Sequence, residues 1–255
     1  MPRPKIIKNL AVIEARMSSA RLPGKVLKDL NRNFKVIDYV ILSVLASKYF
    51  NNSNVIVAIP NNQKQIKLKN YIKKKYKIGI HCGSENNVFM RIKTLVEKTP
   101  SINLLRVTAD NPLIDHFLIN RFVKYFNRKK NVEYLSTRSM EHSKLWKSKS
   151  DFSPGISLEI FKSYLLKKIA KKVNNKNMQF PTYNIFSNPD KFKLEKFKMI
   201  NKYKTYKANK TRFTLDYKKD LLYLRSLFQS LNLVPGENNF LKICEQKLKK
   251  SYNHI

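Results

Sequence analysis

The chain has 255 residues, of which 42% are apolar, so it is long enough to bury the core of one α/β domain. It carries 52 Lys and Arg against 17 Asp and Glu, a net charge of +35, and no apolar run reaches the roughly 18 residues that a membrane-spanning helix needs. With two cysteines, no CxxC pair and no signal-peptide pattern at its start, the sequence predicts a protein of the reducing cytoplasm.

The charge alone would suit a polyanionic partner such as RNA or an anionic membrane surface. However, the cations are 41 Lys and only 11 Arg, beside 27 Asn and 5 Gly. A drift of codons toward A and T produces this composition and spreads lysine over solvated surfaces without any partner. We therefore expect that nucleic acid is not the partner, and that any affinity for RNA is weak and steeply salt-dependent.

The first half alternates between apolar runs and helical patterns. Strands are predicted at 9–15, 54–59, 77–82 and 104–108, and helices at 36–46, 63–75, 87–97 and 116–126. Such alternation implies right-handed βαβ crossovers, and so an α/β fold with a mostly parallel central sheet flanked by helices. In these sheets ligands bind beyond the carboxyl ends of the strands.

The second half is less regular. An irregular insertion is predicted at 134–150, a helix at 157–172, strands at 191–199 and 211–215, and closing helices at 219–230 and 240–250. No linker or internal repeat separates the halves. We therefore expect a single domain over 1–255, with parts at about 9–130, 131–235 and 236–255.

The strongest local signal is the loop RMSSARLPGK at 16–25, directly after the first predicted strand. It holds three cations, two hydroxyls and a Pro-Gly turn. The residues that carry the signal are Arg16, Ser18, Ser19, Arg21, Gly24 and Lys25. Such a loop can wrap a triphosphate with backbone N–H groups, hydroxyls and cations. Neither GxxxxGK[ST] nor GxGxxG is present, and the alternative is a basic surface loop.

Two aspartates follow predicted strands in the same way. Asp110 follows the strand at 104–108, and Asp216 follows the one at 211–215. An aspartate in this position can hold Mg²⁺ against substrate phosphates, because that ion takes one or two carboxylates together with phosphate oxygens and water. The alternative for each is a helix cap, a role that Asp115 fits better than Asp110 does.

Six segments in order resemble those of bacterial sugar cytidylyltransferases. The group they resemble most is the family of spore-coat polysaccharide biosynthesis protein F, which is related to CMP-Kdo and CMP-acylneuraminate synthetases. The segments are RMSSARLPGK (16–25), HCGSENNV (81–88), RVTADNPLID (106–115), PGISLEIF (154–161), NPDKF (188–192) and RFTLD with a following Asp (212–220). The resemblance covers roughly residues 9–230.

The resemblance implies a nucleotide-diphosphosugar transferase (Rossmann-like) fold, with CTP as substrate and Mg²⁺ as cofactor. It implies that CMP passes to a small acidic or sugar acceptor with release of pyrophosphate. The part at 9–130 would bind the nucleotide, and the part at 131–235 would face the acceptor. A homodimer is a further expectation for this protein. The resemblance also assigns roles by position. The catalytic residues would be Lys25, Arg16 and Arg21, and the metal ligands would be Asp110 and Asp216. The nucleotide would be bound by Ser18, Ser19, Gly24, Gly83, Ser84 and Arg106, and the acceptor by Arg138, Gly155 and Glu159.

Departures from the family's pattern are concentrated in the second half. Ser157 stands where the family has an Asp, Gln179–Phe180 stand near its Glu-His pair, and Lys218–Lys219 replace Pro-Glu, while Ala20 replaces a hydroxyl residue in the first loop. Two alternatives to a sugar cytidylyltransferase therefore stay open. One is a catalytically impaired nucleotide-binding homologue, and the other is a basic RNA-binding protein.

Overall fold

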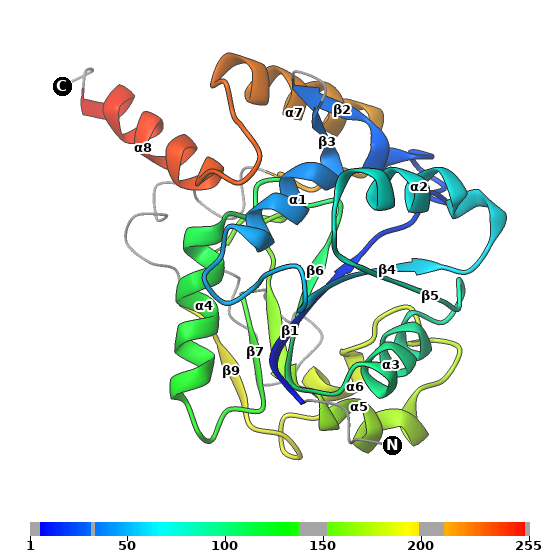
Figure 1. Ribbon diagram of the computed structural model, residues 1–255. Coiled ribbons are helices and arrows are strands. Elements are labelled where there is room, and N and C mark those ends of the chain that lie inside the picture. Colours follow the sequence, from blue (N-terminus) through cyan, green and yellow to red (C-terminus); the bar gives the residue numbers. More distant parts are fainter. Residues whose placement is uncertain (1–5, 32–33, 138–151, 199–211, 253–255) are drawn as a thin grey trace.

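The computed structural model describes residues 6–31, 34–137, 152–198 and 212–252, and its centre is a seven-stranded sheet (Figure 1). The spatial order is β5-β4-β1-β6-β8-β7-β9. The strands are β1 (Ile7–Glu14), β4 (Val55–Pro60), β5 (Gly79–Gly83), β6 (Ser101–Thr108), β7 (Tyr134–Ser136), β8 (Glu159–Lys162) and β9 (Leu194–Lys196). Only β8 runs against its neighbours in this sheet, so the predicted mostly parallel sheet is confirmed.

Helices cover both faces of the sheet (Figure 1). One face packs against α1 (Val36–Leu45), α2 (Ile66–Lys75), α4 (His116–Arg128), α7 (Lys218–Ser230) and α8 (Asn239–Tyr252). The other packs against α3 (Val88–Lys98), α5 (Tyr164–Ile169) and α6 (Tyr183–Phe186). Short 3-10 turns lie at Lys25–Leu27, Gln63–Gln65 and Ala170–Lys172, and a small hairpin pairs β2 (Asp29–Asn31) with β3 (Phe34–Lys35). The eight strand and helix predictions of the first half are therefore confirmed.

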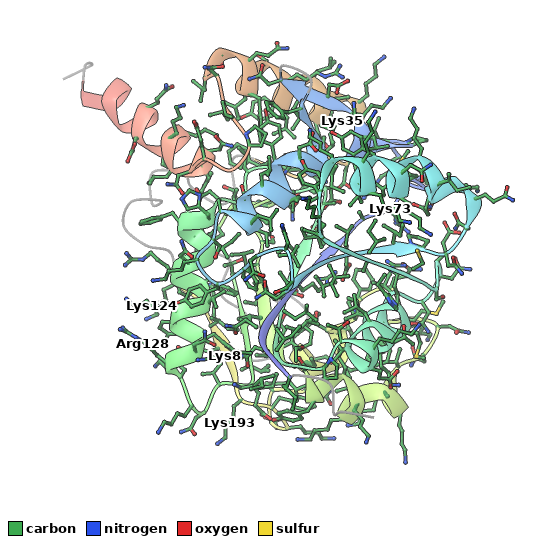
Figure 2. All side chains as sticks on the ribbon, viewed as in Figure 1. Lys8, Lys35, Lys73, Lys124, Arg128 and Lys193 are labelled. Carbon is green, nitrogen blue, oxygen red and sulfur yellow. The ribbon has the colours of Figure 1, made fainter. Side chains whose placement is uncertain are left out.

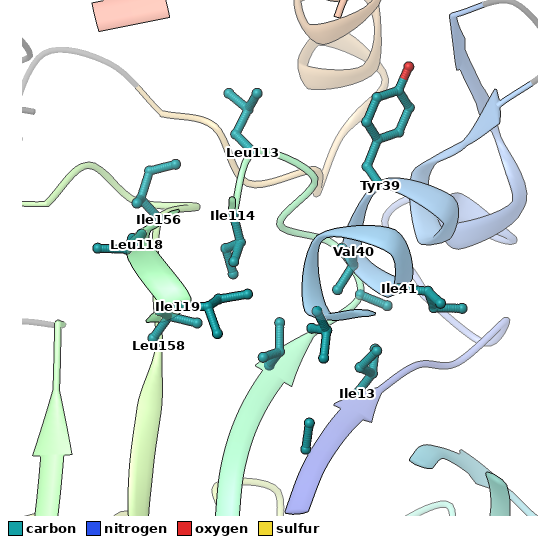
Figure 3. Close-up of a cluster of buried hydrophobic side chains, with 14 of the residues drawn as sticks. Ile13, Tyr39, Val40, Ile41, Leu113, Ile114, Leu118, Ile119, Ile156 and Leu158 are labelled. Carbon is teal, nitrogen blue, oxygen red and sulfur yellow. The ribbon is translucent and has the colours of Figure 1, made fainter. Parts of the chain in front are cut away.

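The packing of β1 explains why its sequence is almost continuously apolar. Leu10 and Val12 belong to the cluster under α3, whereas Ala11 and Ile13 belong to the cluster under α1 and α4. Because side chains alternate between the two faces and both faces are covered, all four positions from 10 to 13 are apolar. Figure 3 shows the second cluster, in which Ile13 of β1 and Val40 of α1 are drawn.

The helix α4 follows directly from its sequence. Its buried residues repeat with helical spacing along one face, and Asp115 caps its first turn by accepting a hydrogen bond from the backbone N–H of Leu118 at 2.8 Å. The buried residues are Leu118, Ile119, Phe122, Val123 and Phe126. The prediction that Asp115 is a helix cap is confirmed.

The order of the strands predicts a ligand-binding position beside β1. The chain moves outward from β1 to β4 and β5, and then returns to β6 on the other side of β1. The crossover connections therefore diverge between β1 and β6, which is where open α/β sheets bind ligands at the carboxyl ends of their strands. The loop at 16–25 follows β1, and Asp110 follows β6.

Four predictions for the second half are wrong or only partly right. The predicted helix at 157–172 contains β8 and then α5, because residues 159–162 pair with β6 on one side and β7 on the other. Pairing on both edges overrides a local pattern that looks helical. The predicted strand at 191–199 shortens to Leu194–Lys196.

The predicted strand at 211–215 does not join the sheet over its described residues. The backbone N–H of Phe213 donates to the carbonyl of Pro154 at 2.7 Å, and that of Leu215 donates to the carbonyl of Asp110 at 2.9 Å. These partners lie in loops, so the segment bridges two loops instead of extending a sheet. Of the predicted insertion at 134–150, Tyr134–Ser136 forms β7 and residues 138–150 lie outside the described residues.

The basic side chains spread over many elements. Figure 2 labels Lys8 on β1, Lys35 on β3, Lys73 on α2, Lys124 on α4 and Lys193 before β9, in different regions of the view. This distribution fits lysine used for solvation. Within the part of the chain that the structure describes, no helix is both long and apolar enough to cross a membrane.

Candidate active site

The loop at 16–25, which we call the basic loop, is closed by hydrogen bonds within its own backbone. The N–H groups of Ser19 and Gly24 both donate to the carbonyl of Met17, at 3.0 and 2.9 Å. Gly24 has φ +67°, a left-handed conformation that glycine adopts without strain, and it ends the loop where the 3-10 turn begins at Lys25. A Gly is therefore needed at this position for its backbone conformation.

Lys25 joins the basic loop to two other segments. It is 7% exposed, and its Nζ donates to Asp110 Oδ2 at 2.7 Å, to the carbonyl of Leu215 at 2.8 Å and to Asp216 Oδ1 at 3.0 Å. The two aspartates are 106 positions apart (216 − 110). The fold thus brings Lys25, Asp110 and Asp216 together, as predicted, although Asp216 follows a loop segment at 212–215 and not the predicted strand.

Asp216 has further cationic partners. Arg21 Nη2 bonds its Oδ1 at 2.7 Å, and Arg212 bonds its Oδ2. Burial raises the pKa of Asp216, but the hydrogen bond and charge of Lys25 and the charges of Arg21 and Arg212 outweigh it, so the pKa lies below its ordinary value of 3.8. Asp216 therefore stays ionised at neutral pH.

Neither Asp110 nor Asp216 caps a described helix. Asp115 caps α4, and the Asp220 carboxylate accepts the backbone N–H groups of Asp216 and Tyr217 at the start of α7, at 2.9 and 2.8 Å. The helix-cap alternative for Asp110 and Asp216 is therefore wrong. No group of three or more His, Cys, Asp or Glu that could hold a metal occurs among the described residues. Asp110 and Asp216 are the two carboxylates that could hold Mg²⁺, because this ion takes one or two carboxylates together with phosphate oxygens and water.

The other predicted residues of the basic loop differ in exposure. Arg16 is exposed and makes no hydrogen bond or ion pair with the described part of the chain. The hydroxyl of Ser18 donates to Glu85 Oε1 at 2.5 Å, whereas buried Ser19 accepts a long bond from the N–H of Leu22 at 3.4 Å. Arg21 also lies over the ring of Tyr217, 5.0 Å from its centroid.

The turn at Gly83 and Ser84 lies beside the basic loop. A Cβ on Gly83 would sit 2.8 Å from Arg91 Cγ, so this glycine allows close packing on α3. Buried Arg91 donates from Nη1 to the carbonyl of Ser84 at 2.5 Å, and the adjacent Glu85 reaches Ser18. The structure therefore brings both predicted nucleotide segments together. The sequence analysis gave no role to Arg91 or Glu85. The signal that could have found them is that arginine and glutamate are both scarce in this chain.

Arg106 and Glu159, predicted for the nucleotide and the acceptor, lie in one buried cluster with Glu14. Arg106 bonds both oxygens of Glu14, from Nε at 2.5 Å and from Nη2 at 2.9 Å, and it bonds Glu159 from Nη1 at 2.8 Å. Burial lowers the pKa of Arg106, but the two carboxylates outweigh it and the pKa is raised. All three guanidinium nitrogens thus have protein partners, and the ligand roles of Arg106 and Glu159 stay predictions. Glu14 was missed, although a glutamate inside an apolar strand is a signal.

Gly155 has a structural reason to be glycine. Its φ is +101°, and a Cβ there would lie 2.4 Å from the carbonyl carbon of Phe213 and 2.5 Å from the nitrogen of Thr214. It therefore supports the segment that carries Asp216, and its predicted contact with an acceptor stays a prediction. Arg138, the remaining acceptor residue, lies outside the described residues.

The fold is the Rossmann-like α/β fold of nucleotidyltransferases. Its basic loop follows β1, and two aspartates are paired on Lys25. The chain matches the cytidylyltransferase family over residues 10–248 and belongs to that family. It is 24% identical over 226 residues to the spore coat polysaccharide biosynthesis protein SpsF of Bacillus subtilis, and the match covers 86% of each chain.

Two solved structures share the fold. A cytidylyltransferase from Leptospira borgpetersenii superposes with a TM-score of 0.81 at 23% identity and covers 96% of both chains. A CMP:2-keto-3-deoxy-manno-octonic acid synthetase in complex with CTP superposes with a TM-score of 0.63 at 13% identity, covering 89% of this chain and 100% of the synthetase.

Proposed function

We propose that the protein transfers CMP from CTP to a sugar or sugar-like acid, with release of pyrophosphate, for a cell-surface polysaccharide or glycan. The observation that carries this proposal is the buried Lys25 ammonium, which holds Asp110 and Asp216 together beneath the basic loop. Membership of the cytidylyltransferase family and the similarity to SpsF and to the CMP:2-keto-3-deoxy-manno-octonic acid synthetase support the choice of nucleotide and acceptor class.

The reaction forms one bond and breaks another at the α-phosphorus of CTP. An acceptor oxygen attacks this phosphorus, and the bond to the β-phosphate oxygen breaks, so that pyrophosphate leaves with the bonding electrons. Lys25, Arg16 and Arg21 provide positive charge at the phosphates. Catalysis of this kind depends on positioning and charge neutralisation and needs no nucleophile from the protein.

Mg²⁺ is proposed as the cofactor, with Asp110 and Asp216 as its protein ligands. When bound, the ion would neutralise phosphate charge and orient the triphosphate. We propose the cytoplasm as the compartment, which the free thiols of Cys82 and Cys244 support, and a homodimer stays a prediction.

The proposed function is tested by pyrophosphate release from CTP with Mg²⁺ and a panel of sugars and sugar acids. We expect release with one acceptor class and tighter binding of CTP than of ATP or GTP in calorimetry. Equal affinity for the purine nucleotides would show that the choice of CTP is wrong. Tight CTP binding without release for any acceptor would favour a catalytically impaired homologue.

The metal assignment is tested by Asp110→Asn and Asp216→Asn, with exposed Asp29→Asn as the control. Asparagine keeps the shape and removes the charge, so each site variant should lower turnover by about 100-fold or more. The double variant should add little, because residues acting as a unit are not additive. Turnover and the Mg²⁺ concentration for half-maximal rate are measured. Normal turnover in either single variant would refute a shared metal.

A further inference from the structure

A closed ring of hydrogen bonds connects the basic loop to the loops that follow β4 and β5. Gln65 Oε1 accepts the backbone N–H of Met17 at 2.8 Å, and its Nε2 donates to Asn62 Oδ1 at 3.2 Å. Asn62 Nδ2 donates to Glu85 Oε2 at 2.6 Å. The Ser18 hydroxyl donates to Glu85 Oε1 at 2.5 Å, which returns the ring to the residue after Met17.

The ring lies where three neighbouring strands end. β5, β4 and β1 are adjacent and parallel, so the loops after them meet at the same edge of the sheet. Gln65 is 1% exposed, although it is a polar side chain on a short 3-10 turn. A buried carboxamide is stable only when its donor and acceptor are both bonded, and the ring bonds both. The burial of Gln65 is therefore tied to the position of Met17.

We propose that Gln65 is a positioning residue that holds the basic loop in the conformation that binds the nucleoside triphosphate. The inference rests on the proposed function. Gln65 fixes the backbone at Met17 directly, and through Asn62 and Glu85 it fixes the Ser18 hydroxyl beside the Gly83–Ser84 turn. A loop ordered before binding loses less conformational entropy when the substrate arrives, so the ring should act on substrate binding.

The effect should separate KM from kcat. Lys25 is held by its own bonds to Asp110, Asp216 and the Leu215 carbonyl, which do not involve the ring. Loss of the ring should therefore weaken CTP binding while leaving the groups at the aspartates in place. A loss of overall stability alone would lower the amount of folded enzyme and would not raise KM.

The test compares Gln65→Ala with Gln63→Ala, an exposed glutamine two positions earlier. For Gln65→Ala we expect KM for CTP to rise about tenfold or more with kcat within about threefold of wild type. We also expect faster hydrogen exchange at the Met17 amide. Gln63→Ala should leave both unchanged. Equal KM and equal Met17 exchange in the two variants would overturn the inference.

A second pair keeps the test decisive if Gln65→Ala does not fold. Asn62→Ala opens the ring at a half-buried member, and exposed Asn61→Ala is its control. A folded Asn62→Ala variant with wild-type KM and Met17 exchange would overturn the inference. A wild-type protein that binds no CTP would instead overturn the proposed function, and Met17 exchange in the variants would still decide whether the ring fixes the loop.

Discussion

At the scale of single residues, one ammonium group assembles the candidate site. Lys25 sits among two carboxylates and a carbonyl, and its side chain is only 9% exposed. A buried lysine is tolerated because opposite charges and hydrogen bonds replace its lost hydration. Its three partners lie after β6 and in the loop at 212–216, and the fold brings these distant parts of the chain to the loop after β1.

Replacing Lys25 should damage both catalysis and stability. We expect Lys25→Ala to lower turnover by about 100-fold or more, because a positive charge at the phosphates is worth most in the transition state. It should cost about 1–3 kcal/mol of unfolding free energy, since Asp110 and Asp216 lose their shared partner. Exposed Lys28→Ala is the control and should change neither quantity much. Equal effects of the two variants on turnover would point to general electrostatics.

The lowered pKa of Asp216 predicts a dependence of stability on pH. A carboxylate whose pKa falls on folding stabilises the protein fully above its unfolded value, and this contribution is lost as pH falls through the folded pKa. The difference in unfolding free energy between wild type and Asp216→Asn should therefore be constant above the ordinary value of 3.8 and shrink below it. Urea unfolding of both proteins from about pH 7 to about pH 3 measures this. A difference that grows toward acid pH would contradict it.

At the scale of elements, the second half supports the site because the segment at 212–216 is hydrogen-bonded to two other loops. Phe213 and Leu215 bond to the carbonyls of Pro154 and Asp110, and Gly155 lies directly against the backbone of Phe213 and Thr214. The segment at 212–216 is thus held by loops on both sides rather than by a strand ladder. These contacts with the two loops position Asp216.

Gly155→Ala should be strongly destabilising for two reasons. Its positive φ strains an L side chain, and the added Cβ would overlap backbone at 2.4 Å, so we expect a loss of about 3 kcal/mol. Gly236→Ala is the matched control, because its φ is also positive at +86° but its nearest neighbour would lie 3.6 Å away. It should cost about 1 kcal/mol. Urea unfolding gives both values, and equal losses would show that the close approach to Phe213 is unimportant.

At the scale of the whole molecule, both halves of the chain share one sheet. The boundary between the two halves is the pairing of β6 with β8, in which Leu104, Leu105 and Arg106 lie opposite Phe161, Ile160 and Glu159. The ion pair between Arg106 Nη1 and Glu159 Oε2, at 2.8 Å, crosses the same boundary. Strands from the second half therefore cover apolar surface that β6 would otherwise expose.

This shared sheet predicts a single cooperative unfolding transition. Far-UV and near-UV circular dichroism should give coincident urea curves, because losing the second half exposes β6 and the core beneath it. A chain that ends at residue 130 should lack a cooperative transition, since it removes β7, β8 and β9. Two separated transitions in the full chain would contradict the single domain that we propose.

The sequence determined the alternating first half, because covered strands and amphipathic helices carry their burial in local periodicity. The run at 10–13 is apolar at every position, and α4 has its cap and its stripe within fourteen residues, Asp115–Arg128. The basic loop was equally local, since its cations, hydroxyls and glycine are contiguous in the chain. The composition also separated lysine used for solvation from the few arginines and glycines with specific contacts.

Only the tertiary structure decided which distant groups meet. The strand β8 forms because two neighbours pair with it, and the segment at 212–216 leaves the sheet because loop carbonyls take its N–H groups. Glu14 and Gln65 are polar side chains whose burial depends on Arg106 and Met17, which lie 92 and 48 positions away. Periodicity records the face on which a residue lies but not its partner across the chain, because such pairing depends on how separate elements pack.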